Sequence, residues 1–291
     1  LIEENKELLE LVKNARIHSG ISCIFKRIKP TPEGKAQYQA EKRELDNIVR
    51  RFIKDFQREI KERKLGSTMT GLYMGKRISS KDVHRYDKRI FSRKIAPENI
   101  PDMAVGIMID CSGSMYWDDK LEISKRCAYI TYAFCQKMEI PCFIIGHTTD
   151  DSKVVIFDVA EPKSLDGKDC ERIFSLIDVD CNRDGYALRY CMEKLDSMKA
   201  NTKVMFVISD GQPNHDGYGI SQGRADVQEC VREFIKKGIQ TITAGIGDDA
   251  MSVKSVYTQD ASPRACAQFL DITDLEKMPK AFIKIIKNYL Q

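Results

Sequence analysis

The chain has 291 residues, 42% of them hydrophobic, which is enough for one large globular domain or for a domain with an appendage. No run of 18 apolar residues and no signal-peptide pattern is present, so the composition argues against a membrane protein and favours a cytoplasmic one. The net charge of +4 hides an asymmetry, because residues 1–100 carry 24 Lys and Arg against 14 Asp and Glu, and the rest carries 23 against 29.

The basic front of the chain, residues 1–100, reads as a helical extension. Apolar residues recur at three- and four-residue steps within residues 36–65, which predicts a long amphipathic helix that stops near Gly66. A shorter helix is predicted around residues 8–15, with Pro30 and Pro32 breaking the chain between the two. Ser79 looks like the N-cap of a short basic helix. Because the chain opens on Leu1 in mid-pattern, we expect it to be a piece of a longer protein.

From residue 101 to residue 291 the pattern changes to short apolar runs that alternate with amphipathic stretches. Strands are predicted at residues 104–109, 142–146, 154–159, 204–208, 241–246 and 269–272. Helices are predicted at residues 121–138, 171–177, 187–198, 226–237 and 275–290. This alternation predicts an α/β, doubly wound and mostly parallel sheet. The link between the second and third strands is too short for a crossover helix, so the third strand is predicted to be an antiparallel edge strand.

The ten cysteines are scattered through these elements without any C-x-x-C pair. Their distribution favours reduced, mostly buried thiols over a disulfide or zinc framework.

Three segments rich in oxygen-bearing side chains follow predicted strands or precede a predicted helix. They are DCSGSM from Asp110, DVDCNRDGYAL from Asp178 and SDGQPNHDG from Ser209. In an open sheet of this kind, ligands bind beyond the carboxyl ends of the strands, so we expect the three segments to meet. Asp110, Ser112 and Ser114 alternate, which lets their side chains project toward one point. Hydroxyls and carboxylates suit a hard divalent cation, and the natural candidate is Mg²⁺, with Mn²⁺ or Ca²⁺ as alternatives.

DCSGSM resembles the D-x-S-x-S signature of the von Willebrand factor type A domain, and SDGQP resembles a second motif of that family. The resemblance covers roughly residues 101–291 and implies a metal-ion-dependent adhesion site. It implies that Ser112 and Ser114 bind the metal directly, and that Asp110 and Asp210 hold it through water.

The middle segment departs from the family pattern. The family usually supplies a threonine here, but CNRDGYAL places Asn182 at that position and Asp184 just before the glycine. Either oxygen could serve as the ligand, and a loop-to-helix cap is the alternative for both residues. The N-R-D-G-x-A-L form is similar to a bacterial subgroup, the cobaltochelatase T-subunit and the nitric-oxide-reductase-activation D-type proteins. The stretch at residues 76–94 also looks like that subgroup.

The subgroup resemblance implies a non-catalytic partner of a ring-forming AAA+ ATPase of the MoxR or chelatase class, which helps to load or activate a client metalloenzyme. A cation with one open position would accept an acidic side chain from the partner. The rival interpretation is a metal-dependent phosphohydrolase on a similar sheet. Against it, the sequence shows no placed general base and too few carboxylates for a two-metal centre.

Several other polar residues and glycine patterns could be taken for catalytic or binding groups, but structural roles explain them better. Asp118 and Asp119 are expected as helix N-terminal charges, and His147, His215 and Asp216 as loop or hairpin residues. Cys111 lacks a base at fixed spacing and is not predicted to be a nucleophile. The glycine patterns at residues 71–76 and 245–247 depart from nucleotide-binding loops. The basic front lacks a base-reading motif, so we expect no nucleic acid partner.

Overall fold

The computed structural model describes residues 2–13, 16–64, 68–94, 102–151, 153–211, 213–246, 250–257 and 267–289. The chain divides into two compact units, Ile53–Pro101 on the one hand, and Leu1–Phe52 together with Asp102–Gln291 on the other. The sequence predicts a helical extension up to residue 100 and a separate domain from residue 101, and this domain division stays a prediction. In the structure, the first 52 residues belong to the same unit as the region after residue 101.

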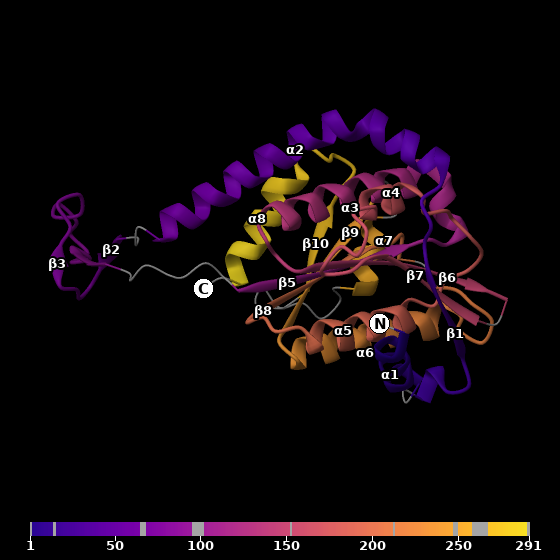
Figure 1. Cartoon of the computed structure of the whole chain (residues 1–291). Helices are drawn as coiled ribbons and strands as arrows, with labels where there is room; N and C mark the ends of the chain where they lie inside the picture. The colour runs from indigo at the N-terminus through magenta and orange to yellow at the C-terminus, as the bar shows by residue number, and fades with distance from the viewer. Residues whose placement is uncertain are drawn as a thin grey trace. The chain divides into compact units, whose positions relative to one another are not determined.

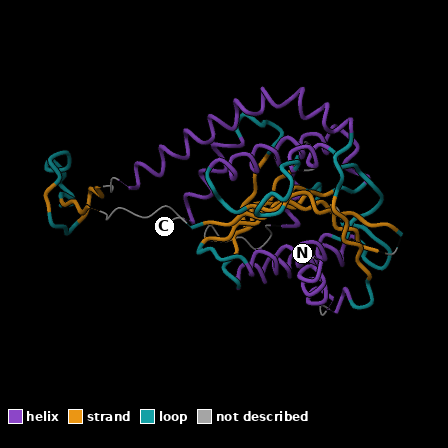
Figure 2. Tube along the Cα trace, viewed as in Figure 1, coloured by secondary structure: helices purple, strands orange, loops and turns teal. Residues whose placement is uncertain are grey.

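The larger unit is built on a seven-stranded sheet with the order β1-β7-β6-β5-β8-β9-β10 (Figures 1 and 2). Its strands are β1 (Ser22–Arg27), β5 (Met103–Asp110), β6 (Cys142–Asp150), β7 (Lys153–Ala160), β8 (Thr202–Ile208), β9 (Ile239–Gly245) and β10 (Ala267–Asp271). Neighbouring strands run parallel except β6 and β7, which are antiparallel. The predicted α/β fold, a mostly parallel sheet with one antiparallel pair, is confirmed.

Helices cover both faces of this sheet (Figure 1). They are α1 (Ile2–Lys13), α2 (Pro32–Lys64), α3 (Lys120–Lys137), α4 (Asp169–Phe174), α5 (Asp184–Ser197), α6 (Ile220–Lys236), α7 (Ala250–Tyr257) and α8 (Met278–Tyr289), with short 3₁₀ segments η1 (Arg16–His18) and η2 (Gly113–Asp119). All eight residues of β5 are buried. Successive side chains of a strand point to opposite faces of the sheet, so both faces must be covered by helices.

Each face of the sheet has its own apolar packing. On one face, Leu9 and Val12 of α1 join a core cluster with residues of α5, α6 and the central strands. On the other face, Phe52 of α2 stacks on Phe134 of α3 with ring centroids 4.0 Å apart, and it meets Phe282 of α8 edge-on. The helical periodicity of the basic N-terminal residues therefore arises because α1 and α2 each bury an apolar face in the core of the larger unit.

Two details of the front differ from the sequence prediction. The strand β1 pairs in parallel with β7 and occupies the sheet edge, so the prediction that the third strand lies at the edge is wrong. The helix α2 also begins earlier than predicted. Thr31 caps it by accepting the amide proton of Gly34 at 3.0 Å, and Pro32 fits the first turn, where its missing N–H costs nothing. Gly66 lies outside the described residues.

The smaller unit contains a three-stranded antiparallel sheet with the order β2-β4-β3. Its strands are β2 (Thr68–Leu72), β3 (Arg77–Ile78) and β4 (Phe91–Lys94). The short basic helix predicted after Ser79 is wrong, because the segment between β3 and β4 consists of turns. The amide of Ser79 donates to the carbonyl of Ile90, which ties this segment to the sheet.

Among the described helices, none combines the length and apolar character needed to cross a membrane.

Candidate metal centre

The first loop of the candidate site follows β5, where the strand ends in Asp110. One carboxylate oxygen of Asp110 accepts the amide proton of Ser112 at 2.9 Å, which closes a tight turn. The turn brings the hydroxyls of Ser112 and Ser114 to 3.0 Å from each other. Asp110 is fully buried, whereas Ser114 is only half-buried. The spacing of D-x-S-x-S therefore gathers its three oxygen-bearing side chains, as predicted.

The other carboxylate oxygen of Asp110 joins this loop to two more. It accepts hydrogen bonds from the Asn182 amide at 2.9 Å and from the Ser209 hydroxyl at 3.1 Å. The Asn182 side-chain oxygen in turn accepts the amide proton of Asn214 at 2.8 Å. Asn182 thus uses both ends of its amide to bridge the first and third loops. In this arrangement it orients Asp110 instead of presenting a free oxygen.

Asp184 lies at the start of α5 and is fully buried. Its carboxylate lies 3.3 Å from Nε2 of His147 on β6 and accepts a hydrogen bond from the Tyr257 hydroxyl at 3.1 Å. Burial raises the pKa of Asp184 well above its ordinary value, and the negative charges of Asp110 and Asp210 raise it further. Burial lowers the pKa of His147 to about 3, which keeps its ring neutral.

Asp210 follows β8 and is also buried. Gly211, with φ at +76°, makes the sharp turn that places Asp210 beyond the strand end. Because β8 pairs with β5, Asp210 and Asp110 both lie at the carboxyl edge of the sheet, and the charges of both add to the effect of burial on the pKa of Asp184. The structure therefore brings all six predicted residues, Asp110, Ser112, Ser114, Asn182, Asp184 and Asp210, to one edge of the sheet.

The donor set fits a divalent cation. Three buried carboxylates in one region repel one another, and a cation close to them would offset that repulsion. Hydroxyl and carboxylate oxygens suit Mg²⁺, Mn²⁺ or Ca²⁺. Ligand atoms of Asp110, His147 and Asp184 also lie within 4.8 Å of one another, which makes an inner set below the serines. Sequence reasoning missed His147, since only its place on the neighbouring parallel strand brings it beside Asp110.

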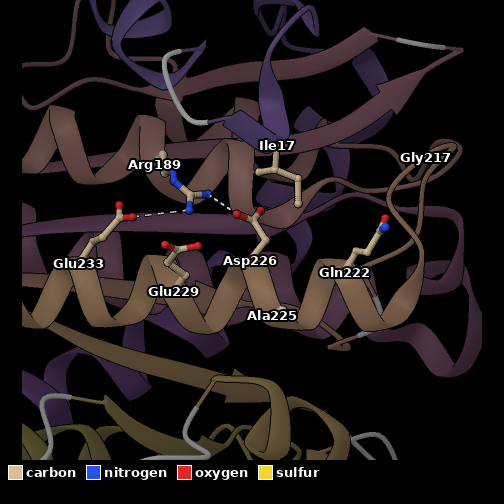
Figure 3. Close-up of a pocket in the computed structure, with 8 residues that line it drawn as sticks. All are labelled: Ile17, Arg189, Gly217, Gln222, Ala225, Asp226, Glu229 and Glu233. Atoms are coloured by element: carbon tan, nitrogen blue, oxygen red, sulfur yellow. Dashed lines mark hydrogen bonds and ion pairs between the residues drawn. The ribbon is translucent and has the colours of Figure 1, made fainter.

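Next to the second loop, a buried polar network holds the segment η1. The Arg183 guanidinium donates to Nδ1 of His18 at 3.2 Å and to the carbonyl of Ile17 at 2.8 Å. Since Nδ1 of His18 accepts, its Nε2 carries the proton and lies 3.2 Å from the Asp226 carboxylate. Arg189 pairs with the same carboxylate at 2.6 Å (Figure 3).

A pocket of about 640 Å³ lies beside this network, between η1 and α6 (Figure 3). Acidic side chains of α6 line much of it, with Ile17 and Arg189 opposite them. None of the six predicted metal residues lines it, so the pocket is separate from the metal centre.

Removing the His18 ring should destabilise the protein. We expect His18→Ala to lower the free energy of unfolding by about 2–4 kcal/mol, because it removes a fully buried ring, the acceptor of the Arg183 Nε–H and one of the groups that face the Asp226 carboxylate. Urea denaturation measures this change, and His84→Ala, at an exposed histidine, is the matched control. Equal losses in the two variants would show that the network does not hold this segment.

Comparison with known proteins agrees with the fold. Residues 172–280 match the family model of the von Willebrand factor type A domain. The structure resembles the PilB minor pilin from Streptococcus sanguinis, at 17% identity and a TM-score of 0.53, covering 70% of this chain and 66% of that one. It also resembles the vWF domain of the type V pili tip protein Mfa5 from Porphyromonas gingivalis, at 10% identity and a TM-score of 0.50, covering 67% and 98%. At these identities the likeness shows the fold alone.

The larger unit therefore has the fold of a von Willebrand factor type A domain, and residues 172–280 match the model of that family. Domains of this family often bind a divalent metal, and the cluster at the carboxyl edge of the sheet is a possible site for one. A curated relative, "Uncharacterized protein YojO" from Bacillus subtilis (strain 168), is 25% identical over 280 residues. That match covers 92% of this chain but only 43% of the relative, so the chain spans less than half of its length.

Proposed function

We propose that this domain is a metal-dependent protein-interaction module that performs no catalysis. A divalent cation would be held by Ser112 and Ser114 directly and by Asp110 and Asp210 through water. The cation would supply one open coordination position, and a carboxylate of the partner would fill it.

The observation that supports this proposal most is the difference in exposure across the cluster. Ser114 is half-buried and stands at the rim, whereas Asp110, His147 and Asp184 are fully buried. A cation beside the two serines can be reached by a partner side chain, but one held by the inner set cannot. The inner carboxylates then provide negative charge that strengthens cation binding from behind.

The finer proposal is that the partner is an AAA+ ATPase of the MoxR or chelatase class, acting on a client metalloenzyme. It is supported by sequence alone, through the N-R-D-G-x-A-L form of the second loop and the basic stretch at residues 76–94. We also propose a reducing compartment such as the cytoplasm. Nine cysteines within the described residues are free thiols, which suits such a compartment.

Phosphatase and ATPase assays distinguish the interaction module from an enzyme. Phosphatase and ATPase activity measured with Mg²⁺ should stay at the level of the buffer blank, because the proposed module makes and breaks no bond. Turnover that Asp110→Ala abolishes would favour the phosphohydrolase.

Partner capture tests the interaction module. Binding to a co-encoded AAA+ ATPase should weaken when a chelator is added, and Ser112→Ala should weaken it likewise. Ser80→Ala, at an exposed serine outside the site, is the control. Binding that ignores both the chelator and Ser112→Ala would place the interface away from the metal.

A further inference from the structure

The rim of the metal centre carries an exposed aromatic pair. Tyr116 and Trp117 directly follow the D-x-S-x-S turn, are 68% and 67% exposed, and meet edge-to-face with centroids 5.6 Å apart. Ile177, in the loop that leads to Asn182, is 59% exposed. Large apolar side chains left in water beside a binding site are typical anchors for a partner.

The same rim is strongly acidic. Four segments at this rim hold seven aspartates against Lys153, a balance of −6; they are residues 116–119, residues 150, 151 and 153, residues 177–182 and residues 214–219. Hydrogen bonds tie these segments to the site, since the Gly113 amide donates to the Asp180 carbonyl at 2.7 Å and His215 meets the Asp151 carbonyl at 2.8 Å. We call these four segments, with Tyr116, Trp117 and Ile177, the metal edge.

The smaller unit presents the opposite charge. Residues 70–93, here called the basic sheet, hold seven lysines and arginines, all exposed, against two aspartates, a balance of +5. This short segment also leaves five large apolar side chains exposed, namely Tyr73, Met74, Ile78, Val83 and Tyr86. A surface that combines positive charge with uncovered apolar residues fits an acidic, aromatic partner surface.

A carboxylate stands within the basic sheet, at Asp87. Its side chain is 44% exposed and follows Tyr86, which is fully exposed. The Arg85 guanidinium pairs with it through two contacts of 3.2 and 2.8 Å and lowers its pKa, so it is ionised at neutral pH. The other aspartate, Asp82, is less accessible, with a side chain that is 15% exposed.

We propose that the basic sheet of one copy docks on the metal edge of a second copy, with Asp87 as the carboxylate that reaches the cation. The inference rests on the proposed function, because it needs a cation with an open position. Both complementary surfaces belong to this chain, which is why a second copy is the occupant. Such a contact joins two different surfaces, so it builds rings or filaments and not a closed symmetric dimer.

Two variants that each block one surface test the docking. Lys81→Glu with Lys88→Glu blocks the basic sheet, and Trp117→Ala with Asp118→Asn blocks the metal edge. In Mg²⁺ and low salt, light scattering should show a wild-type mass that grows with concentration and falls with added NaCl. Each variant alone should be monomeric, and an equimolar mixture should form a 1:1 dimer that grows no further. A monomeric wild-type protein, a monomeric mixture, or variants that assemble like the wild type would overturn the docking.

The role of Asp87 has its own test. Asp87→Asn should weaken self-association in Mg²⁺ by about tenfold or more, to the level that EDTA gives for the wild type. Removing a negative charge makes the basic sheet more positive, so simple charge attraction predicts the opposite change. Asp82→Asn is the matched control and should have no such effect. Equal effects of the two variants would overturn the assignment of Asp87.

Calorimetric titration of Mg²⁺ into the same wild-type samples separates the two proposals. Metal binding without self-association overturns the docking and leaves the interaction module intact. A titration without metal binding overturns the interaction module itself.

Discussion

Asp110→Ala is expected to abolish divalent-cation binding, with a loss of affinity of about 100-fold or more. Asp110 is the point where the three loops meet, because its carboxylate accepts from Ser112, Asn182 and Ser209. Without it, a negative charge is lost and the serine turn is no longer held. Isothermal titration with MgCl₂ and MnCl₂ measures the affinity, and the increase in thermal stability on adding metal should disappear as well.

Asp118→Asn is the matched control for this experiment. Asp118 is an exposed aspartate of the same loop, at φ +57°, a conformation that asparagine tolerates. It should change metal affinity only slightly, through screened long-range charge. Equal metal affinity in Asp110→Ala and the wild-type protein would show that the cation is not held at this loop.

Asp184→Asn is expected to stabilise the metal-free protein while weakening metal binding. The change removes a buried charge that Asp110 and Asp210 oppose, and the free energy of unfolding should rise by about 1–3 kcal/mol. An asparagine keeps the hydrogen bond from Tyr257, because its oxygen can accept it, and its amide can donate to Nε2 of His147, which lies 3.3 Å from the Asp184 carboxylate. Urea denaturation in EDTA measures the first effect, and metal titration measures the second.

Asp226→Asn is expected to change stability in the opposite direction. Asp226 is also a buried aspartate, and it lies on α6. The pKa of Asp226 is lowered despite its burial, because His18 and Arg189 stabilise its charge. Its replacement should therefore lower the free energy of unfolding by about 3 kcal/mol. A stability change of the same sign in Asp184→Asn and Asp226→Asn would contradict the view that Asp184 sits among uncompensated negative charges.

The sheet and the positions of the first and third loops follow directly from sequence pattern. Continuous apolar runs such as residues 104–109 belong to strands covered on both faces, and the carboxyl ends of parallel strands share one edge. These two rules bring Asp110 and Asp210 together, and Asn182, which lies in the loop before α5, joins them through its hydrogen bond to Asp110. The spacing within D-x-S-x-S also determines the local turn, since Asp110 caps Ser112 only two residues away.

The features that the sequence pattern did not predict depend on tertiary contacts between distant parts of the chain. The strand β1 alternates exposed and half-buried residues and includes Lys26 and Arg27, so it lacks the apolar run that marked the other strands. His147 lies within a strand longer than its apolar core, and only pairing with β5 aligns it with Asp110. His18 is an isolated histidine whose partners Arg183 and Asp226 are more than 160 residues away in sequence. No short-range pattern indicates such pairs.

The most direct test of the central claim is a crystal structure of the protein grown with Mn²⁺, with anomalous diffraction used to locate the metal. We predict an anomalous peak at about 2.0–2.3 Å from the hydroxyl oxygens of Ser112 and Ser114, with one coordination position open to solvent or filled by a neighbouring carboxylate. A peak only between Asp110, His147 and Asp184, or no peak at this edge of the sheet, would contradict the account.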